Sequence, residues 1–209
     1  MSQDLFASGP EWLLDNQLLL IKDFLSSDEA TQLQRMLTET MPWKQETLTI
    51  YGKEHPIPRL QAWMGDDNIQ YRYSGKTFQA ERWSGQLKTL ADKLSTVAAT
   101  RFNSVLLNLY RDGNDAMGWH SDDEPELGPA PVIASLSLGA ERDFAVRRRG
   151  SSRQHAVISL PHGSLLIMQA GMQRQWQHSV PRRKAISDSR INLTFRQIFT
   201  DKTLPESGT

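Results

Sequence analysis

The sequence predicts an α+β fold with two helices in its N-terminal half and many short strands in its C-terminal half. Before residue 100, apolar residues twice recur at the three- and four-residue spacing of an amphipathic helix. From Asn103 onward the apolar runs are short, and Gly, Asp and Pro punctuate them. Such strands are typical of an antiparallel sandwich or barrel. Because 209 residues are few for two full cores and no linker-like stretch separates the halves, we expect one domain over residues 1–209.

The N-terminal elements can be placed from local signals. Residues 1–16 are expected to form a loose arm, and residues 18–24 an apolar strand. Ser26 or Ser27, followed by acidic residues, predicts the start of a helix, and Pro42 marks its end.

The next segment indicates a hairpin followed by a second helix. Residues 43–51 have strand-like composition, and Tyr51-Gly52-Lys53 is typical of a hairpin tip. Pro56 and Pro58 interrupt the chain after this hairpin, and residues 71–75 end another extended piece. Residues 83–99 place their leucines on one helical face. The strands predicted after residue 100 are 104–110, 132–138, 143–148, 155–160, 164–169 and 191–198.

Composition restricts the possible chemistry. The chain has no cysteine, which excludes disulfides, thiolate zinc sites and cysteine nucleophiles, so any metal must use histidine and carboxylate ligands. The formal net charge is zero, which argues against a broad cationic surface. Basic runs at 147–149 (three arginines) and 182–184 (two arginines and a lysine) are local patches that suit either solvated loops or phosphate contacts. With no membrane-length apolar run and no secretory signal, we expect a cytoplasmic protein without membrane contact, and a monomer by default.

The strongest chemical signal is His120-x-Asp122 together with the distant His178. Two imidazoles and one carboxylate can fill one face of a metal and leave other positions open, which suits a non-haem Fe(II) centre. His120 and Asp122 would face the same way if both lay on one strand. His178 would then arrive on a neighbouring strand. His-x-Asp alone is a weak motif that also fits a solvated loop.

A second signal is the alternation Arg190-x-Asn192-x-Thr194-x-Arg196. On a strand these polar side chains share one face, while Ile191, Leu193 and Phe195 share the other. Two inward arginines require anionic partners, and a dicarboxylate supplies two. A solvent-facing polar strand would show the same alternation.

Taken together, Asn108-x-Tyr110, His120-x-Asp122, His178 and the residues 190–196 resemble the AlkB family of Fe(II)/2-oxoglutarate dioxygenases, over roughly residues 40–199. The resemblance implies a double-stranded β-helix, or jelly roll, as a dioxygenase core over residues 101–199. It also implies an N-terminal extension with a nucleotide-recognition lid within residues 1–100.

The resemblance also implies a role for each motif residue. His120, Asp122 and His178 would hold Fe(II) as the catalytic metal. Asn108, Tyr110 and Arg190 would bind the distal carboxylate of 2-oxoglutarate, Arg196 the carboxylate near the metal, and Asn192 and Thr194 would line the same site. The implied reaction is oxidative demethylation of N-alkylated bases such as 1-methyladenine and 3-methylcytosine, with release of formaldehyde.

Within the family, the chain resembles the members that act on double-stranded DNA. Ile50, Tyr51 and Gly52 resemble their finger hairpin, whose apolar tip would fill the gap left by a flipped base. Arg59, which comes shortly after that finger, is implied to contact the substrate as well. An ordinary exposed hairpin would leave the same sequence pattern.

Four further residues are implied to contact the base. Tyr73, with Tyr71 on the same strand, would stack on the flipped base, unless both tyrosines pack in the core. Asp123 or Glu124 would accept a hydrogen bond from the exocyclic amino group and favour a cationic lesion, although both also suit a solvated loop. RNA or a protein side chain is the alternative substrate, and a binding module on an oxygenase fold is the alternative class.

Overall fold

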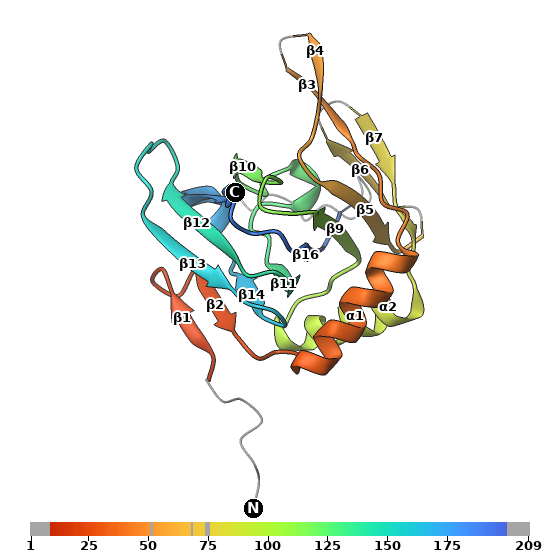
Figure 1. Ribbon diagram of the computed structural model, residues 1–209. Helices are drawn as coiled ribbons and strands as arrows, with labels where there is room; N and C mark the ends of the chain where they lie inside the picture. Colours follow the sequence, from red (N-terminus) through yellow and green to blue (C-terminus); the bar gives the residue numbers. More distant parts are fainter. Residues whose placement is uncertain (1–8, 51, 68, 74–75, 200–209) are drawn as a thin grey trace, which may run out of the picture.

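The computed structural model describes residues 9–199 apart from residues 51, 68, 74 and 75. Figure 1 shows two helices on one side of a large sheet, with a smaller sheet on the other side and a hairpin that projects away from the body. The large sheet has eight strands, in the order β1 (Glu11–Leu13), β2 (Leu18–Ile21), β14 (Leu165–Met168), β11 (Ile133–Gly139), β16 (Arg190–Arg196), β9 (Ser104–Tyr110), β5 (Leu60–Gly65) and β8 (Glu81–Arg82).

The smaller sheet consists of β10 (Met117–His120), β15 (Trp176–Val180), β12 (Arg142–Arg148) and β13 (Ala156–Leu160), in that order. From β9 onward the chain passes repeatedly between the two sheets, because β9, β11, β14 and β16 lie in the large sheet and β10, β12, β13 and β15 in the small one. Apart from the parallel pair of β5 and β8, both sheets are antiparallel, and this alternation between two sheets is typical of a jelly roll.

Two two-stranded hairpins stand apart from these sheets. They are β3 (Thr47–Ile50) with β4 (Lys53–Pro56), and β6 (Gln70–Tyr73) with β7 (Lys76–Gln79). The chain also forms α1 (Ser27–Thr40), α2 (Gly85–Val97), the one-turn helix α3 (Met172–Gln175) and a 3-10 turn at Pro125–Leu127. Over the part of the chain that is described, the helices are too short and too polar to cross a membrane.

Two apolar clusters hold the layers together. One joins the helices to the outer face of the large sheet and contains Leu37, Leu94 and the apolar residues Ile191, Leu193 and Phe195 of β16. The other fills the space between the sheets, with Leu166 on one side and Phe144, Val146 and Trp176 on the other. Burial of this apolar surface is the main stabilising contribution to such a fold.

The predicted helices are confirmed, and their ends follow from local chemistry. Ser26, rather than Ser27, caps α1: the Glu29 backbone N–H donates to Ser26 Oγ, and the Ser26 N–H donates to the Glu29 carboxylate at 2.9 Å. This reciprocal pair is a capping box. Ser84 caps α2 through the N–H of Leu87.

The N-terminal prediction needs two corrections. Residues 11–13, expected in a loose arm, form β1 and pair with β2, while residues 1–8 lie outside the described residues. The strand β5 was not expected at all, because two prolines precede it. It nevertheless pairs with β9 along its whole length, since Ala62 and Met64 reach the core under the helices. Residues before 101 therefore extend the large sheet in addition to forming the hairpins.

Candidate metal centre

Three side chains converge near the end of the small sheet. The ligand atoms of His120, Asp122 and His178 lie within 4.8 Å of one another. Asp122 and His178 are buried, and His120 is half-buried. His178 Nε2 lies 3.8 Å from Asp122 Oδ2, and the two imidazole ring centroids are 4.2 Å apart. One ion can therefore contact all three groups, which is the arrangement that a facial triad requires.

Strand pairing brings the two histidines together. β10 and β15 are antiparallel neighbours, and His120 lies directly opposite His178. The prediction that His178 arrives on an adjacent strand is confirmed. The expectation that His120 and Asp122 share one strand is wrong, because β10 ends at His120 and Asp122 lies in the following loop.

Hydrogen bonding and burial prepare these groups for a metal. His120 Nδ1 lies 2.9 Å from the Gly118 carbonyl, which can only accept, so this nitrogen carries the proton and Nε2 is left to bind the ion. Burial lowers the pKa of His178 to about 3. His178 is therefore neutral at physiological pH, and the neutral imidazole is the form that binds metals.

Asp122 is held in its charged form. Its burial alone would raise the pKa, but opposing positive charge, chiefly that of Arg196, lowers the pKa of Asp122 below its usual value. Arg196 Nη2 donates to Asp122 Oδ1 at 2.6 Å in a buried ion pair. Arg196, which the resemblance assigns to 2-oxoglutarate, thus also orients a metal ligand.

The polar face of β16 lies opposite its apolar core face, as the alternation predicts. Arg190 Nη2 donates to Ser137 Oγ at 2.9 Å, and Asn192 Nδ2 donates to Ser135 Oγ at 2.7 Å. Thr194 Oγ1 donates to Asn192 Oδ1 at 2.9 Å. All seven residues of the strand are buried, so a solvent-facing strand is excluded.

Asn108 lies beside Asn192 in the neighbouring strand. Its amide oxygen accepts from Arg59 Nε at 2.9 Å and from Gln61 Nε2 at 2.8 Å. These two donors orient the amide so that its nitrogen is available to an acceptor. Arg59, predicted to contact substrate, is buried here beside the residues predicted to bind the cosubstrate, and its contact with a base stays a prediction.

A cationic region surrounds Tyr110. The guanidinium groups of Arg190 and Arg142 lie 5.3 and 5.6 Å from its ring centroid. Arg190 Nε and Nη1 are buried without a hydrogen-bond partner among the described residues. Burial lowers the pKa of Arg190 to about 10, although the neighbouring Tyr110 hydroxyl opposes this shift. A buried guanidinium with unused donors fits a carboxylate ligand such as that of 2-oxoglutarate.

The residues predicted to contact the base are placed less completely. Gly52 lies at the tip of the β3–β4 hairpin with a φ of +75°, which suits its place in a tight turn. Ile50 ends β3, while Tyr51 lies outside the described residues. Tyr71 and Tyr73 lie on β6, and only their backbone is described.

The two acids after the metal pair differ. Asp123 is exposed and forms an ion pair of 2.6 Å with Arg149. The Oε2 atom of Glu124 is buried without a hydrogen-bond partner in the described part of the chain. Arg147 and Arg148, which precede Arg149, lie over the Trp119 and Trp176 rings at 4.4 and 4.0 Å.

Several contributors were not found from the sequence. The two serines of β11 bind side chains of the polar face of β16, Gln61 binds Asn108 on β9, and Gln173 accepts a hydrogen bond from the Asp122 backbone. The alternation of Ser135 and Ser137 on a predicted strand could have indicated them, but Gln61 and Gln173 lie in segments without such a pattern.

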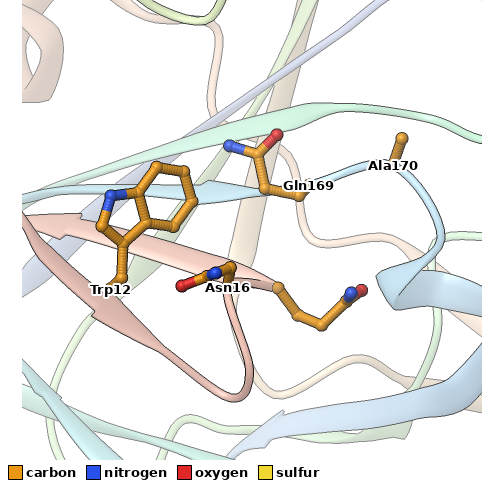
Figure 2. Close-up of a pocket in the computed structure, with 5 residues that line it drawn as sticks. Trp12, Asn16, Gln169 and Ala170 are labelled. Carbon is orange, nitrogen blue, oxygen red and sulfur yellow. The ribbon is translucent and has the colours of Figure 1, made fainter.

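A separate hollow lies away from these residues, beside the turn between β1 and β2. Figure 2 shows Trp12, Asn16, Gln169 and Ala170 around it, and its volume is about 400 Å³. None of the predicted site residues lines it.

A facial triad on a two-sheet jelly roll defines a non-haem iron oxygenase site. Residues 17–196 match the 2OG-Fe(II) oxygenase superfamily. The human DNA oxidative demethylase ALKBH2 is 39% identical over 94% of this chain and 80% of its own length, and the human alpha-ketoglutarate-dependent dioxygenase alkB homolog 3 is 38% identical over 89% and 68%. A solved structure of OsALKBH1 has the same fold, with a TM-score of 0.66 at 18% identity over 90% of this chain and all of that one.

The chain therefore belongs to the AlkB family of Fe(II)/2-oxoglutarate dioxygenases. His120, Asp122 and His178 are its iron ligands, as predicted. The alternative of a binding module on an oxygenase fold is excluded, because the ligand set is complete.

Proposed function

We propose that the protein repairs DNA by oxidative demethylation of N-alkylated bases such as 1-methyladenine and 3-methylcytosine. The observation that carries this proposal is 39% identity, over 94% of the chain, to a DNA oxidative demethylase, together with the complete iron triad. An RNA or protein substrate is the alternative, since the 2-oxoglutarate site contacts only the cosubstrate and does not distinguish between these substrates.

The reaction converts an N-methyl group, 2-oxoglutarate and O₂ into an N-hydroxymethyl group, succinate and CO₂. The hydroxymethyl product then loses formaldehyde and leaves an N–H or the free ring nitrogen. The bound iron supplies the oxygen chemistry, and the protein supplies orientation and charge. In this proposal Arg190, Asn108 and Tyr110 bind the distal carboxylate of 2-oxoglutarate. Arg196, Asn192 and Thr194 line the end nearer the metal.

The test is a formaldehyde-release assay on methylated DNA and RNA oligonucleotides of matched sequence. Iron and 2-oxoglutarate are supplied together or withheld one at a time. We expect release from DNA only when both are present. Release from RNA alone would contradict the proposal and favour the alternative.

The nucleotide-recognition lid is proposed to consist of the β3–β4 and β6–β7 hairpins. A methyl on a base-pairing nitrogen lies inside the duplex, so the base must leave the stack before it can react. The β3–β4 hairpin projects from the body and carries Ile50 and Gly52 at its end (Figure 1). An apolar tip on such a projection suits a wedge that holds the gap open.

We expect Tyr51→Ala to reduce turnover of methylated duplex DNA about tenfold more than turnover of the same strand without its complement. Only the duplex has a gap to fill. Paired kcat/KM measurements on the two substrates check this, with Tyr51→Phe as the control that keeps an aromatic ring. Equal losses of kcat/KM on both substrates would contradict the proposal that the hairpin tip acts as a wedge.

The acid that contacts the base is proposed to be Glu124 rather than Asp123. Asp123 already pairs with Arg149, whereas Glu124 has a buried oxygen with no hydrogen-bond partner among the described residues. A carboxylate there would favour 3-methylcytosine, which is cationic and bears an exocyclic amino group.

We therefore expect Glu124→Gln to lower kcat/KM for 3-methylcytosine about tenfold, and to change kcat/KM for the neutral 3-methylthymine little. Asp123→Asn is the matched control, because it removes a neighbouring charge that Arg149 already neutralises. If Asp123→Asn had the larger effect, the assignment to Glu124 would be wrong.

A further inference from the structure

Gln173 is a buried amide in the one-turn helix between β14 and β15. Its side chain is 1% exposed. It belongs neither to the iron triad nor to the polar face of β16, so its burial needs another explanation. Gly171, with a φ of +92°, starts the turn and lets the chain reverse from β14 into α3. This reversal places Gln173 against the loop that carries Asp122. In the sequence, Gln173 comes five residues before His178.

The orientation of the Gln173 amide is determined by its two partners. Its Oε1 accepts from the Asp122 backbone N–H at 3.0 Å, and its Nε2 donates to Met168 Sδ at 3.3 Å. A backbone N–H can only donate, so the oxygen must face Asp122. The Met168 sulfur, a weak acceptor, accepts the hydrogen bond from the amide nitrogen of Gln173.

Asp122 needs this support more than the two histidines do. His120 and His178 lie on paired strands, whereas Asp122 comes after the end of β10. Its loop is held by side chains instead: Ser121 Oγ donates to the Trp176 carbonyl at 2.8 Å, and Arg196 holds the Asp122 carboxylate. Gln173 is the group that holds the Asp122 backbone.

We propose that Gln173 is a positioning residue for the iron ligand Asp122. It fixes the backbone at the ligand while Arg196 fixes the carboxylate, so that the carboxylate oxygen facing His178 stays directed at the metal. Outer partners of metal ligands typically contribute about 10- to 100-fold in metal affinity. This role of Gln173 at the metal centre is the same whichever nucleic acid is the substrate.

The test is a Co(II) titration of the metal-free protein, followed through the visible absorption of the bound ion. Gln173→Leu keeps the approximate size of the side chain and removes the acceptor, and we expect it to weaken Co(II) binding about 10- to 100-fold. Gln173→Glu keeps an acceptor in either protonation state, and we expect its affinity to stay within about threefold of the parent.

Gln175→Leu is the matched control. It makes the same chemical change in the same helix, but Gln175 is exposed and accepts from Arg148 rather than from the metal loop. We expect it to leave Co(II) affinity unchanged. Unchanged affinity in Gln173→Leu, or an equal loss in Gln175→Leu, would overturn the proposal.

Thermal unfolding of each metal-free variant separates positioning from folding. If Gln173→Leu does not fold, the comparison passes to Gln173→Asn, whose amide is one methylene shorter. We expect Gln173→Asn to bind Co(II) more weakly than Gln173→Glu. The reverse order would contradict the assignment.

Discussion

Replacement of Asp122 by alanine is expected to reduce formaldehyde release from methylated DNA to the level seen without added iron. Asp122 supplies the only carboxylate of the triad, with its ligand atoms within 4.8 Å of those of His120 and His178. Since the loss of an outer partner alone costs about 10- to 100-fold in metal affinity, the loss of a ligand should exceed that range. Co(II) titration and the formaldehyde assay together measure the effect.

The same change should also destabilise the metal-free protein. Asp122 neutralises Arg196 in a buried pair, and breaking such a pair costs about 3 kcal/mol or more. Asp122→Asn is the control, because its amide oxygen keeps the shape and can still accept from Arg196. We expect this variant to fold more stably than the alanine variant and to remain inactive. Turnover in either variant would refute the metal assignment.

The sequence predicted the chemistry of the centre better than its local geometry. His120 and His178 could be grouped because the order of the motifs resembles that of the AlkB family, and because a chain without cysteine must bind a metal through histidine and carboxylate. The place of Asp122 in a loop could not be predicted. Where β10 ends depends on its pairing with β15, a contact between segments almost 60 residues apart.

The two faces of β16 were predictable for a simple reason. A period of two separates Arg190, Asn192 and Thr194 from the apolar residues between them, and the structure places the two sets on opposite faces as that period predicts. The burial of the polar face does not follow from the period, since a solvent-facing strand would show the same alternation. No such period was recognised in β5, because the prolines at 56 and 58 suggested an interrupted chain. The helix α3 is a single turn and is too short to show a period. The contact between Gln173 and Asp122 joins residues 51 apart and depends on the packing of the whole fold.

The second large effect is expected from Arg190→Met. Arg190 is buried at the start of the central strand β16, and its guanidinium donates to the hydroxyl of Ser137, which carries no charge. The carboxylate that would balance this charge is, in our proposal, the distal carboxylate of 2-oxoglutarate. Removing one partner of a buried charge pair typically costs at least about 3 kcal/mol, so we expect the KM for 2-oxoglutarate to rise roughly 100-fold or more.

Stability distinguishes this role from a structural one. Burial lowers the pKa of Arg190 to about 10, which means that the surroundings disfavour its charge when no anion is bound. Replacing a buried ion pair with apolar residues of similar size is often neutral or stabilising, and Arg190→Met leaves no unpaired anion behind because Ser137 is uncharged. The metal-free and cosubstrate-free Arg190→Met protein should therefore unfold at the same temperature as the parent or at a higher one. A structural arginine would give the opposite result.

Stabilisation of the protein by bound 2-oxoglutarate measures the contribution of Arg190 directly. In the presence of a redox-inert divalent metal, 2-oxoglutarate at about 100 times its Kd should stabilise the parent by about 2.7 kcal/mol. At the same concentration it should stabilise Arg190→Met far less, because the ligand no longer saturates the site. Arg190→Lys keeps the charge but not the two-pronged geometry, so it should recover only part of the effect. Full stabilisation of Arg190→Met by 2-oxoglutarate would place the distal carboxylate elsewhere, and the guanidinium beside Tyr110 would then require a different anion.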